Sequence, residues 1–270
     1  MTKGMLAAKF AVLVIFVLYA FPLLLILLAS FKSDTAIVND PAGLIFHPNL
    51  DAYRSVFNTQ LFMGMRNSFF IAGGTMLLAL VAATPLAYAL ARTSARWSGL
   101  VIGVLIALQM TPAATAIIPQ FQIIGQLKLL NSIPGVILAE AAGVLPYATL
   151  ILRPFYLSIP DEVEEAAYID GAGRFRTFAV IVFPLVRNGV SLVGVLLFIG
   201  AWGDFLYPVS FLTDSSKFPM SVLLLLQQGF YGTQWNSLMA LALLGAIPTI
   251  VIFAFVARRL TSGLALGIGK

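Results

Sequence analysis

The sequence contains no cysteine and only one histidine, His47. Without cysteine the chain can form no disulfide, no thiolate metal site and no cysteine nucleophile. A single histidine cannot build a multi-histidine metal cluster. These absences exclude most metalloenzymes and the cysteine hydrolases, and we expect this chain to bind no metal or other cofactor.

Charge is also scarce, since Lys, Arg, Asp and Glu make up 10% of the 270 residues whereas hydrophobic residues make up 60%. A soluble domain carries about 25% charged residues, so this chain lacks the polar surface that a soluble globule of its size needs. The composition therefore predicts a membrane protein surrounded by the lipid bilayer.

A phosphate-binding loop is absent as well. Proteins that hydrolyse ATP with such a loop need the pattern G-x-x-x-x-G-K-[ST], whose backbone amides and lysine hold the phosphates. The pattern does not occur in this sequence. We therefore expect the chain not to be an ATPase, and any ATP chemistry must lie in another polypeptide.

Six long runs with at most one charge are present, and about 20 helical residues are enough to span a bilayer core. Gln227-Gln228-Gly229 interrupts the last run, which leaves a short interfacial helix near residues 221–227. We predict an all-α membrane protein with a single transmembrane domain over residues 1–270. The six predicted spans cover about residues 10–30, 68–91, 98–119, 135–152, 186–205 and 237–257.

The positive charges are unevenly distributed over the predicted loops. With both termini inside, eleven of the 16 Lys and Arg residues lie on the cytoplasmic side and five lie outside. Cytoplasmic loops carry the excess of Lys and Arg, so both termini are predicted to face the cytoplasm. The net charge of +5 therefore reflects topology, and we expect no nucleic acid partner.

One predicted cytoplasmic loop, residues 158–184, holds five of the eleven acidic residues. Pro160 suits a first helical position, and acidic residues in the opening turns stabilise the positive end of the helix dipole. Gly171 ends this helix and permits a tight elbow, after which a second helix leads into the fifth span. The sequence therefore predicts a helix–elbow–helix loop.

The first helix of this loop combines small and acidic side chains. Ala166 and Ala167 would let another surface approach the helix backbone, while Glu164 and Glu165 could pair with cations around the contact. The pattern by itself leaves two interpretations open: a docking element, or an ordinary loop helix with a solvated acidic face.

The loop also resembles the EAA motif of permease subunits from binding-protein-dependent ABC importers. That motif reads E-A-A-x-x-x-G, followed after nine residues by I-x-L-P. This chain has Glu165-Ala166-Ala167-Tyr168-Ile169-Asp170-Gly171, and after nine residues Ile181-Val182-Phe183-Pro184, with Phe in place of Leu. The resemblance assigns ATPase docking to this coupling loop, through Glu164, Glu165, Ala166, Ala167, Asp170, Gly171 and Pro184.

Landmarks elsewhere are similar to the six-span carbohydrate subclass, the maltose and glycerol-3-phosphate type. They include Ser30-Phe31-Lys32, Asn67-Ser68, the stretch from Ala87 to Arg92, and Met110-Thr111-Pro112. The chain departs from the subclass in having Trp202-Gly203-Asp204 for the usual Trp-Asn-Asp or Trp-Asn-Glu. It also lacks the usual G-L-T-x-G-A-V-K-G tail at residues 263–270.

This resemblance implies the permease fold of a type I ABC importer in a bacterial cytoplasmic membrane. The implied partners are a second, related permease subunit forming a heterodimer, two copies of a cytoplasmic ATPase subunit that uses ATP and Mg²⁺, and an extracytoplasmic solute-binding protein. Closure of the ATPase dimer would pull the docked loops together and open the cavity outward. The implied substrate is a sugar or sugar-like solute, and which sugar or polyol stays open.

Three groups of residues at membrane depth are candidates for the substrate path or gate. Asp204 beside Trp202 could bind a sugar through its hydroxyls and its C–H face, or be a surface acid beside an aromatic-belt tryptophan. Glu140 could line the path, lie at the interface or be paired with another helix. A proline in mid-span permits a kink, which could form a gate or only a packed bend. The residues of this predicted kink are Gln109, Thr111 and Pro112.

Two other classes of protein fit the sequence less well than a permease subunit. An ion-coupled secondary transporter usually has ionisable pairs deep in the membrane and an internal repeat. This sequence has two peripheral acids and no repeat, which argues against that class. A membrane-embedded enzyme ranks last because the sequence has no histidine-based or cysteine-based catalytic constellation.

Overall fold

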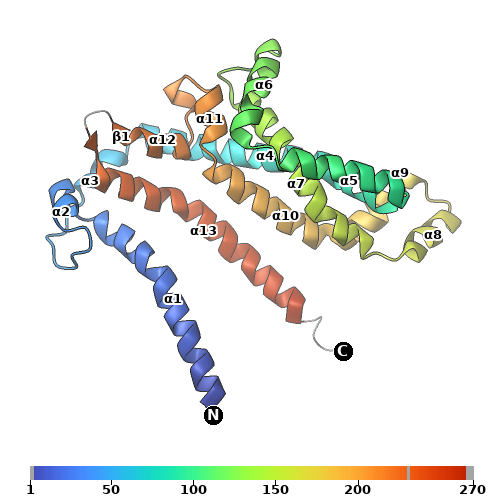
Figure 1. The fold of residues 1–270 in the computed structure, drawn as a ribbon, viewed down its shortest axis with the longest axis horizontal. Coiled ribbons are helices and arrows are strands. Elements are labelled where there is room, and N and C mark those ends of the chain that lie inside the picture. The colour runs from blue at the N-terminus through green and yellow to red at the C-terminus, as the bar shows by residue number, and fades with distance from the viewer. Residues whose placement is uncertain (1–2, 230–231, 266–270) are drawn as a thin grey trace.

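The computed structural model describes residues 3–229 and 232–265, which are almost entirely helical (Figure 1). The last residues of the tail, 266–270, lie outside the described residues. The helices and strands are α1 (Lys3–Ala29), α2 (Asp34–Asn39), α3 (Asp51–Val56), α4 (Thr59–Arg92), α5 (Ala95–Gln109), α6 (Ala113–Gln126), α7 (Ile133–Leu157), α8 (Asp161–Ile169), α9 (Arg174–Arg176), the π-helix η1 (Thr177–Val182), α10 (Phe183–Gly203), α11 (Leu206–Phe211), the 3₁₀ helix η2 (Ser215–Lys217), α12 (Met220–Leu226), β1 (Gln228–Gly229), β2 (Gly232–Thr233) and α13 (Trp235–Ala265).

The core lies where α4, α7 and α10 pack together. Small residues line these contacts, among them Ala79, Ala83 and Ala87 on α4 and Ala141 and Ala148 on α7. Small residues allow helix backbones to approach closely, which is how helices associate in membranes. The three helices therefore form the rigid centre of the molecule.

The first and last helices lie on one side of this centre, with α13 next to α10 and α1 beyond α13 (Figure 1). Helix α13 packs against α1 and α10. Between Lys9 and Ala29 the most apolar part of α1 buries none of its residues, and the side chains of Phe16 and Leu18 are exposed. Such an apolar, unburied helix suits contact with lipid or with another membrane helix.

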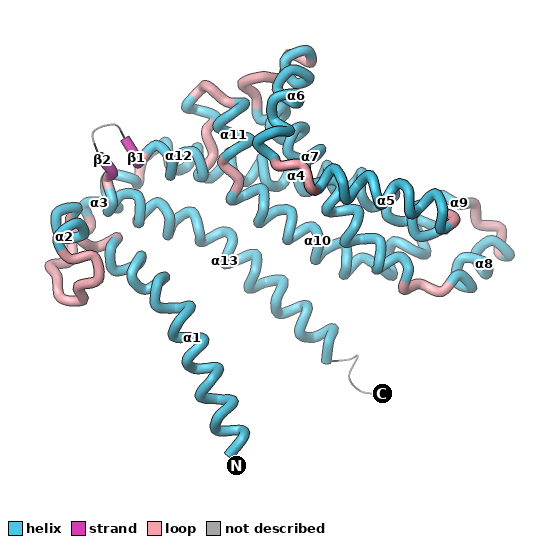
Figure 2. The backbone as a smooth tube through the Cα atoms, in the orientation of Figure 1, coloured by secondary structure: helices cyan, strands magenta, loops and turns pink. Residues whose placement is uncertain are grey.

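Five helical segments are long and apolar enough to cross a membrane, and a sixth is counted if α5 and α6 form one broken span. Within the predicted span over residues 98–119, the expected kink at Pro112 is a sharp corner, because α5 and α6 meet at a bend of 99°. Pro112 is the N-cap of α6 with extended backbone (ψ 134°), and its ring cannot continue the preceding helix. Figure 2 shows the loop at this corner.

Two smaller predictions concern the segment before α13. The short helix expected near residues 221–227 is confirmed as α12. The interruption at Gln227-Gln228-Gly229 is the first strand of a two-stranded hairpin, in which Gln228 pairs with Thr233. The segment therefore turns at the surface, and α13 begins a separate span.

Candidate docking and coupling site

The predicted coupling loop forms one end of the molecule, where α8 and α9 extend beyond the helical bundle (Figure 1). Pro160 is the N-cap of α8, and three acidic residues occupy the first turn: Asp161, Glu162 and Glu164. Negative side chains in this turn interact favourably with the free N–H groups of the helix. The start of the predicted helix is therefore confirmed to within one residue.

The elbow after α8 depends on Gly171. Its φ of +80° lies in the left-handed region that favours glycine. The N–H of Gly171 donates to the carbonyl of Tyr168 (3.0 Å), and the N–H of Ala172 donates to that of Ala167 (2.9 Å). This left-handed ending satisfies the last carbonyls of α8 and reverses the chain.

The second half of the loop returns to the bundle through α9 and η1. Directly after η1, Pro184 occupies the first turn of α10. In a regular α-helix the proline ring would clash with the carbonyl four residues earlier, and the wider π turn precedes it here. Pro184 therefore marks the point where the loop becomes a span, and it is not itself on α8.

Charged and large apolar side chains are both exposed on the outer face of α8 and the elbow. Glu165, Ala166 and Asp170 are exposed, as the docking interpretation requires. Ile169 is 86% exposed and Phe175 is 82% exposed. Large apolar side chains exposed together in a charged loop are typical of an interaction surface. The docking residues predicted from the sequence do not include Ile169 and Phe175, because the predicted pattern consists of small and charged residues.

Glu164 does not belong to this exposed face, which corrects its assignment to the docking surface. Its side chain is only 7% exposed. One carboxylate oxygen accepts a hydrogen bond from Nε of Arg92 (2.7 Å), and the other accepts one from the hydroxyl of Tyr88 (2.6 Å). The reason is its position in α8, where it faces the end of α4 and not solvent.

Aromatic rings continue this contact into the core. The ring of Tyr88 lies 4.9 Å from that of Phe178 in η1 and 5.7 Å from that of Tyr156 in α7, measured between centroids. Aromatic pairs at these distances stabilise beyond their buried area. The end of α4 is therefore the common anchor for both halves of the coupling loop.

Trp202 and Asp204 have separate roles in this structure. The indole of Trp202 is buried, stacks on Phe198 and donates its N–H to the carbonyl of Gly245 (2.9 Å). The Asp204 carboxylate accepts the backbone N–H of Tyr207 at the start of α11 (3.1 Å). In this conformation the indole holds α13 against α10, and the carboxylate holds the start of α11.

Glu140 is buried between α7 and α4, with a relative exposure of 2%. The hydroxyl of Thr75 donates to one of its oxygens (3.0 Å). Glu140 thus lies inside the helix bundle, where it is paired with α4.

The residues of the predicted kink lie at the corner between α5 and α6. Gln109, Thr111 and Pro112 are all exposed there. They do not join the group around Glu140, so the structure separates the predicted gate from the other path candidates. Over residues 3–229 and 232–265, no three acidic or histidine side chains come together in a way that could hold a metal ion.

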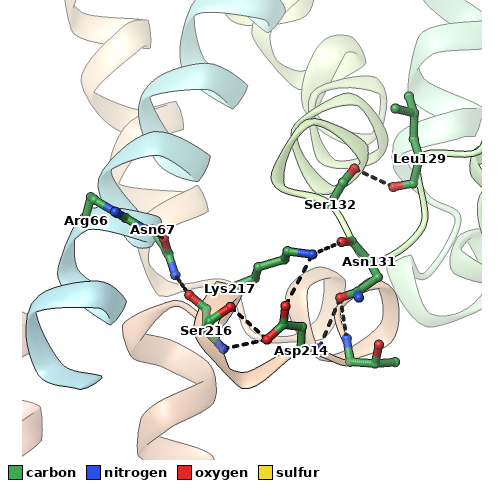
Figure 3. Close-up of polar contacts among 9 residues, drawn as sticks. Arg66, Asn67, Leu129, Asn131, Ser132, Asp214, Ser216 and Lys217 are labelled. Carbon is green, nitrogen blue, oxygen red and sulfur yellow. Dashed lines mark hydrogen bonds and ion pairs between the residues drawn. The ribbon is translucent and has the colours of Figure 1, made fainter. Parts of the chain in front are cut away.

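Near α11, a polar network joins helix α4 to two segments of the chain, the turn before α7 and residues 213–217 (Figure 3). The side-chain oxygen of Asn131 accepts the N–H groups of Thr213 and Asp214 (both 3.1 Å), and Lys217 donates to the Asn131 carbonyl (2.9 Å). The side chain of Asn67 donates to the carbonyl of Ser216 (2.9 Å). We call this network the α11-end latch.

Hydrogen bonds from Ser216, and then the nearby Lys217, hold the pKa of Asp214 below its ordinary value. A carboxyl with a depressed pKa stabilises the fold above its unfolded pKa and loses that effect as pH falls through the folded pKa. The charged form of Asp214 in the latch is thus maintained at neutral pH and lost only in acid.

Replacing Asn131 with alanine is expected to lower the free energy of unfolding by about 2 kcal/mol, because the variant loses two hydrogen bonds and must adopt a left-handed φ without an amide side chain. The φ of Asn131 is +53°. Thermal unfolding of the detergent-solubilised protein measures the loss. Asn131→Gly relieves the backbone strain but not the lost hydrogen bonds, so it should fall between wild type and alanine; equal stability of all three proteins contradicts the role of the latch.

Comparison with known proteins agrees with this architecture. A family model described as "Binding-protein-dependent transport system inner membrane component" matches residues 76–265. The chain is 33% identical over 249 residues to the sulfoquinovosyl glycerol transport system permease protein SmoH of Agrobacterium fabrum, covering 92% of this chain and 87% of that protein. It is 30% identical to the diacetylchitobiose uptake system permease protein NgcG of Streptomyces coelicolor, covering 91% of this chain and 82% of that protein.

A similar fold is found among solved structures. One chain of a bacterial ABC transporter involved in the import of the acidic polysaccharide alginate matches with a TM-score of 0.75 at 20% identity. The match covers 96% of this chain and 98% of that chain. The helical arrangement described above is therefore an arrangement that a solved transporter subunit also adopts.

Proposed function

Since the chain belongs to the family of binding-protein-dependent transport system inner membrane components and is a permease subunit of an ABC importer, we propose that it forms one half of a translocation pathway for a sugar or sugar-like solute. A second, related permease supplies the other half. Two copies of a separate ATPase subunit hydrolyse ATP, and an extracytoplasmic binding protein delivers the solute.

The observation that carries this proposal is the exposed face of the coupling loop. Glu165 and Ala166 lie on it together with the apolar side chains of Ile169 and Phe175. A short helix of this kind, held at a rigid elbow and anchored to the bundle behind it, is suited to sit in a groove of another protein and transmit its movement. The ATPase subunit is the partner that this face fits.

The proposed orientation places α8 and both termini in the cytoplasm. The eleven-to-five distribution of Lys and Arg supports it through the positive-inside rule. The α11-end latch and the hairpin β1–β2 then face the binding protein. This arrangement suits a multi-pass protein of a bacterial cytoplasmic membrane.

The sugar class of substrate is proposed from the relatives, whose names refer to sulfoquinovosyl glycerol and diacetylchitobiose. For the path itself we propose Glu140 with its partner Thr75, and also Asp204, because carboxylates and hydroxyls exchange hydrogen bonds readily with sugar hydroxyls. Trp202 would join this group only if α10 and α13 separate during transport. For the gate we propose the corner from Gln109 to Pro112, where two rigid helices meet.

Replacing Ile169 with aspartate is expected to reduce the ATPase subunit that co-purifies with the solubilised permease pair by about tenfold or more, because burying an isoleucine contributes about 1.5–3 kcal/mol to an interface. The matched control is Ile45→Asp, since Ile45 is 99% exposed in the loop between α2 and α3, far along the chain from α8. That variant should retain the ATPase as wild type does.

Two outcomes would contradict the proposal. One is equal ATPase retention by both isoleucine variants. The other is a wild-type chain that holds no ATPase and supports uptake that resists ATP depletion but stops with an uncoupler, which would favour an ion-coupled transporter. If the proposal holds, a thermal-shift screen of the cognate binding protein against sugars would identify the substrate.

A further inference from the structure

We propose that Arg92 and Tyr88 are positioning residues that clamp the coupling helix α8 to the end of α4, so that movement of α8 is transmitted directly to α4. This inference rests on the proposed function, because it concerns how movement of the ATPase reaches the translocation pathway. The clamp consists of Glu164 on α8 with Tyr88 and Arg92 on α4.

The clamp uses both oxygens of a buried carboxylate. Nε of Arg92 donates to one oxygen of Glu164 (2.7 Å) and the hydroxyl of Tyr88 donates to the other (2.6 Å). The side chains of Glu164 and Arg92 are 7% and 20% exposed, respectively. Removing one partner of a buried charge pair leaves the other charge without compensation in a poorly solvated place. The pair therefore resists separation when α8 is pulled.

Arg92 also holds the chain just before α8. One of its terminal nitrogens donates to the carbonyl of Ile159 (3.0 Å), and another lies 3.4 Å from the carboxylate of Asp161. The Asp161 side chain is exposed, so that pair contributes little. The guanidinium nevertheless makes contact on both sides of the helix start, which a lysine could not do because its ammonium is a single point charge.

The geometry of α4 makes it a suitable arm for such movement. Tyr88 and Arg92 are four residues apart, so they lie on one face of the helix. The 34 residues of α4 extend about 50 Å at about 1.5 Å per residue. Near its other end, Asn67 donates to the carbonyl of Ser216, and Ser68 accepts the N–H of Met220. The helix therefore connects the docking end of the molecule to the α11-end latch.

The backbone of α8 itself packs against η1, while the long side chains of Tyr88 and Arg92 bridge the remaining space to α4. Without the clamp, movement of α8 would act on α7 and α10 through the chain connections and through the packing of α8 against η1. With the clamp intact, the same movement also displaces α4, the helix that packs against both of them. Loss of the clamp should thus uncouple transport from ATP hydrolysis without abolishing docking.

The test uses the complete reconstituted transporter with its binding protein. Arg92→Gln is expected to retain the ATPase within about twofold of wild type but to lower solute transported per ATP hydrolysed by about tenfold. Tyr88→Phe keeps the ring contacts and removes one hydrogen bond, so a smaller loss is expected. The charge exchange of Arg92→Glu with Glu164→Arg should restore much of the ratio that either single change loses.

A second measurement follows the distance between α8 and α4 directly. The chain has no cysteine, so Glu162→Cys and Thr93→Cys introduce the only two labelling sites on this subunit. Both positions are exposed. Spin labels at these sites should keep one narrow distance with and without ATP when the clamp is intact, and a broader or shifted distance when Arg92→Gln is added.

Three results would overturn the inference: a transport-to-ATP ratio that Arg92→Gln leaves unchanged, a label distance that is insensitive to that substitution, or loss of the ATPase as complete as with Ile169→Asp. Such a loss of the ATPase by Arg92→Gln would mean that the clamp only stabilises the folded docking surface. Failure of the proposed function is distinguishable, since the wild-type chain would then hold no ATPase at all.

Discussion

Replacing Gly171 with valine is expected to lower ATPase retention and ATP-driven uptake by about tenfold or more, because a left-handed backbone costs a residue with a Cβ about 1–2 kcal/mol and costs a β-branched residue more. Gly171 has a φ of +80°, and no atom lies within 4 Å of the position that a Cβ would take. The loss would therefore come from the backbone of the elbow and not from a steric clash.

Gly173 offers a matched control two residues away. It also has open space around the Cβ position, but its φ of −74° and ψ of 163° are ordinary extended backbone. Gly173→Val should therefore dock and transport almost as wild type does, and Gly171→Asn should be intermediate because asparagine tolerates the left-handed region. If both valine variants lose activity equally, the conformation of the elbow is not what the docking surface requires.

Replacing Gly135 with alanine is expected to lower the free energy of unfolding by about 3 kcal/mol, at the upper end of the usual cost of overpacking. A Cβ at this position would lie 2.1 Å from the carbonyl oxygen of Leu129. That oxygen belongs to the backbone of the turn before α7, which also accepts a hydrogen bond from Ser132 (2.6 Å) and carries Asn131 of the latch. The turn cannot move away without breaking these contacts.

The control for this prediction is Gly103→Ala, in the middle of α5. No atom lies within 4 Å of its Cβ position. Alanine there should be neutral or stabilising by up to about 1 kcal/mol, since glycine lowers helix propensity. Thermal unfolding of the solubilised variants, monitored as the loss of the monodisperse species, measures the change in stability of both variants. Equal unfolding temperatures for Gly135→Ala and wild type would show that the turn is far more adaptable than the structure indicates.

The long helices α1, α4, α7, α10 and α13 could be predicted from sequence because a bilayer imposes a length on uncharged runs. The start of α8 and the elbow at Gly171 could also be predicted, since proline, acidic first turns and glycine act locally. A kink at Pro112 could also be predicted, but the size of the bend between α5 and α6, 99°, could not. Hydropathy measures the length of an apolar run, and it carries no information on the direction that the chain takes after a proline.

In the candidate site, too, the sequence does not predict which of two similar residues is buried. Glu164 and Glu165 are adjacent and chemically identical, yet one is buried and the other exposed. Neighbouring positions on a helix point about 100° apart, and only the position of α4 decides which of them meets Arg92. For Trp202, likewise, a contact with Gly245 forms between residues that are remote in sequence.

The scarcity of charge by itself determined that this chain is a membrane protein, and the EAA spacing indicated a permease subunit with a coupling loop. The absence of cysteine excluded disulfides and thiolate sites, and the sequence contains no phosphate-binding loop pattern. These are properties of composition and of local order along the chain. Tertiary structure decided that one side of α8 is bound to Tyr88 and Arg92 and that the other side stays exposed. The exposed side is the one on which we propose that the ATPase docks. Burial and pairing of a charge depend on neighbours that only folding brings together.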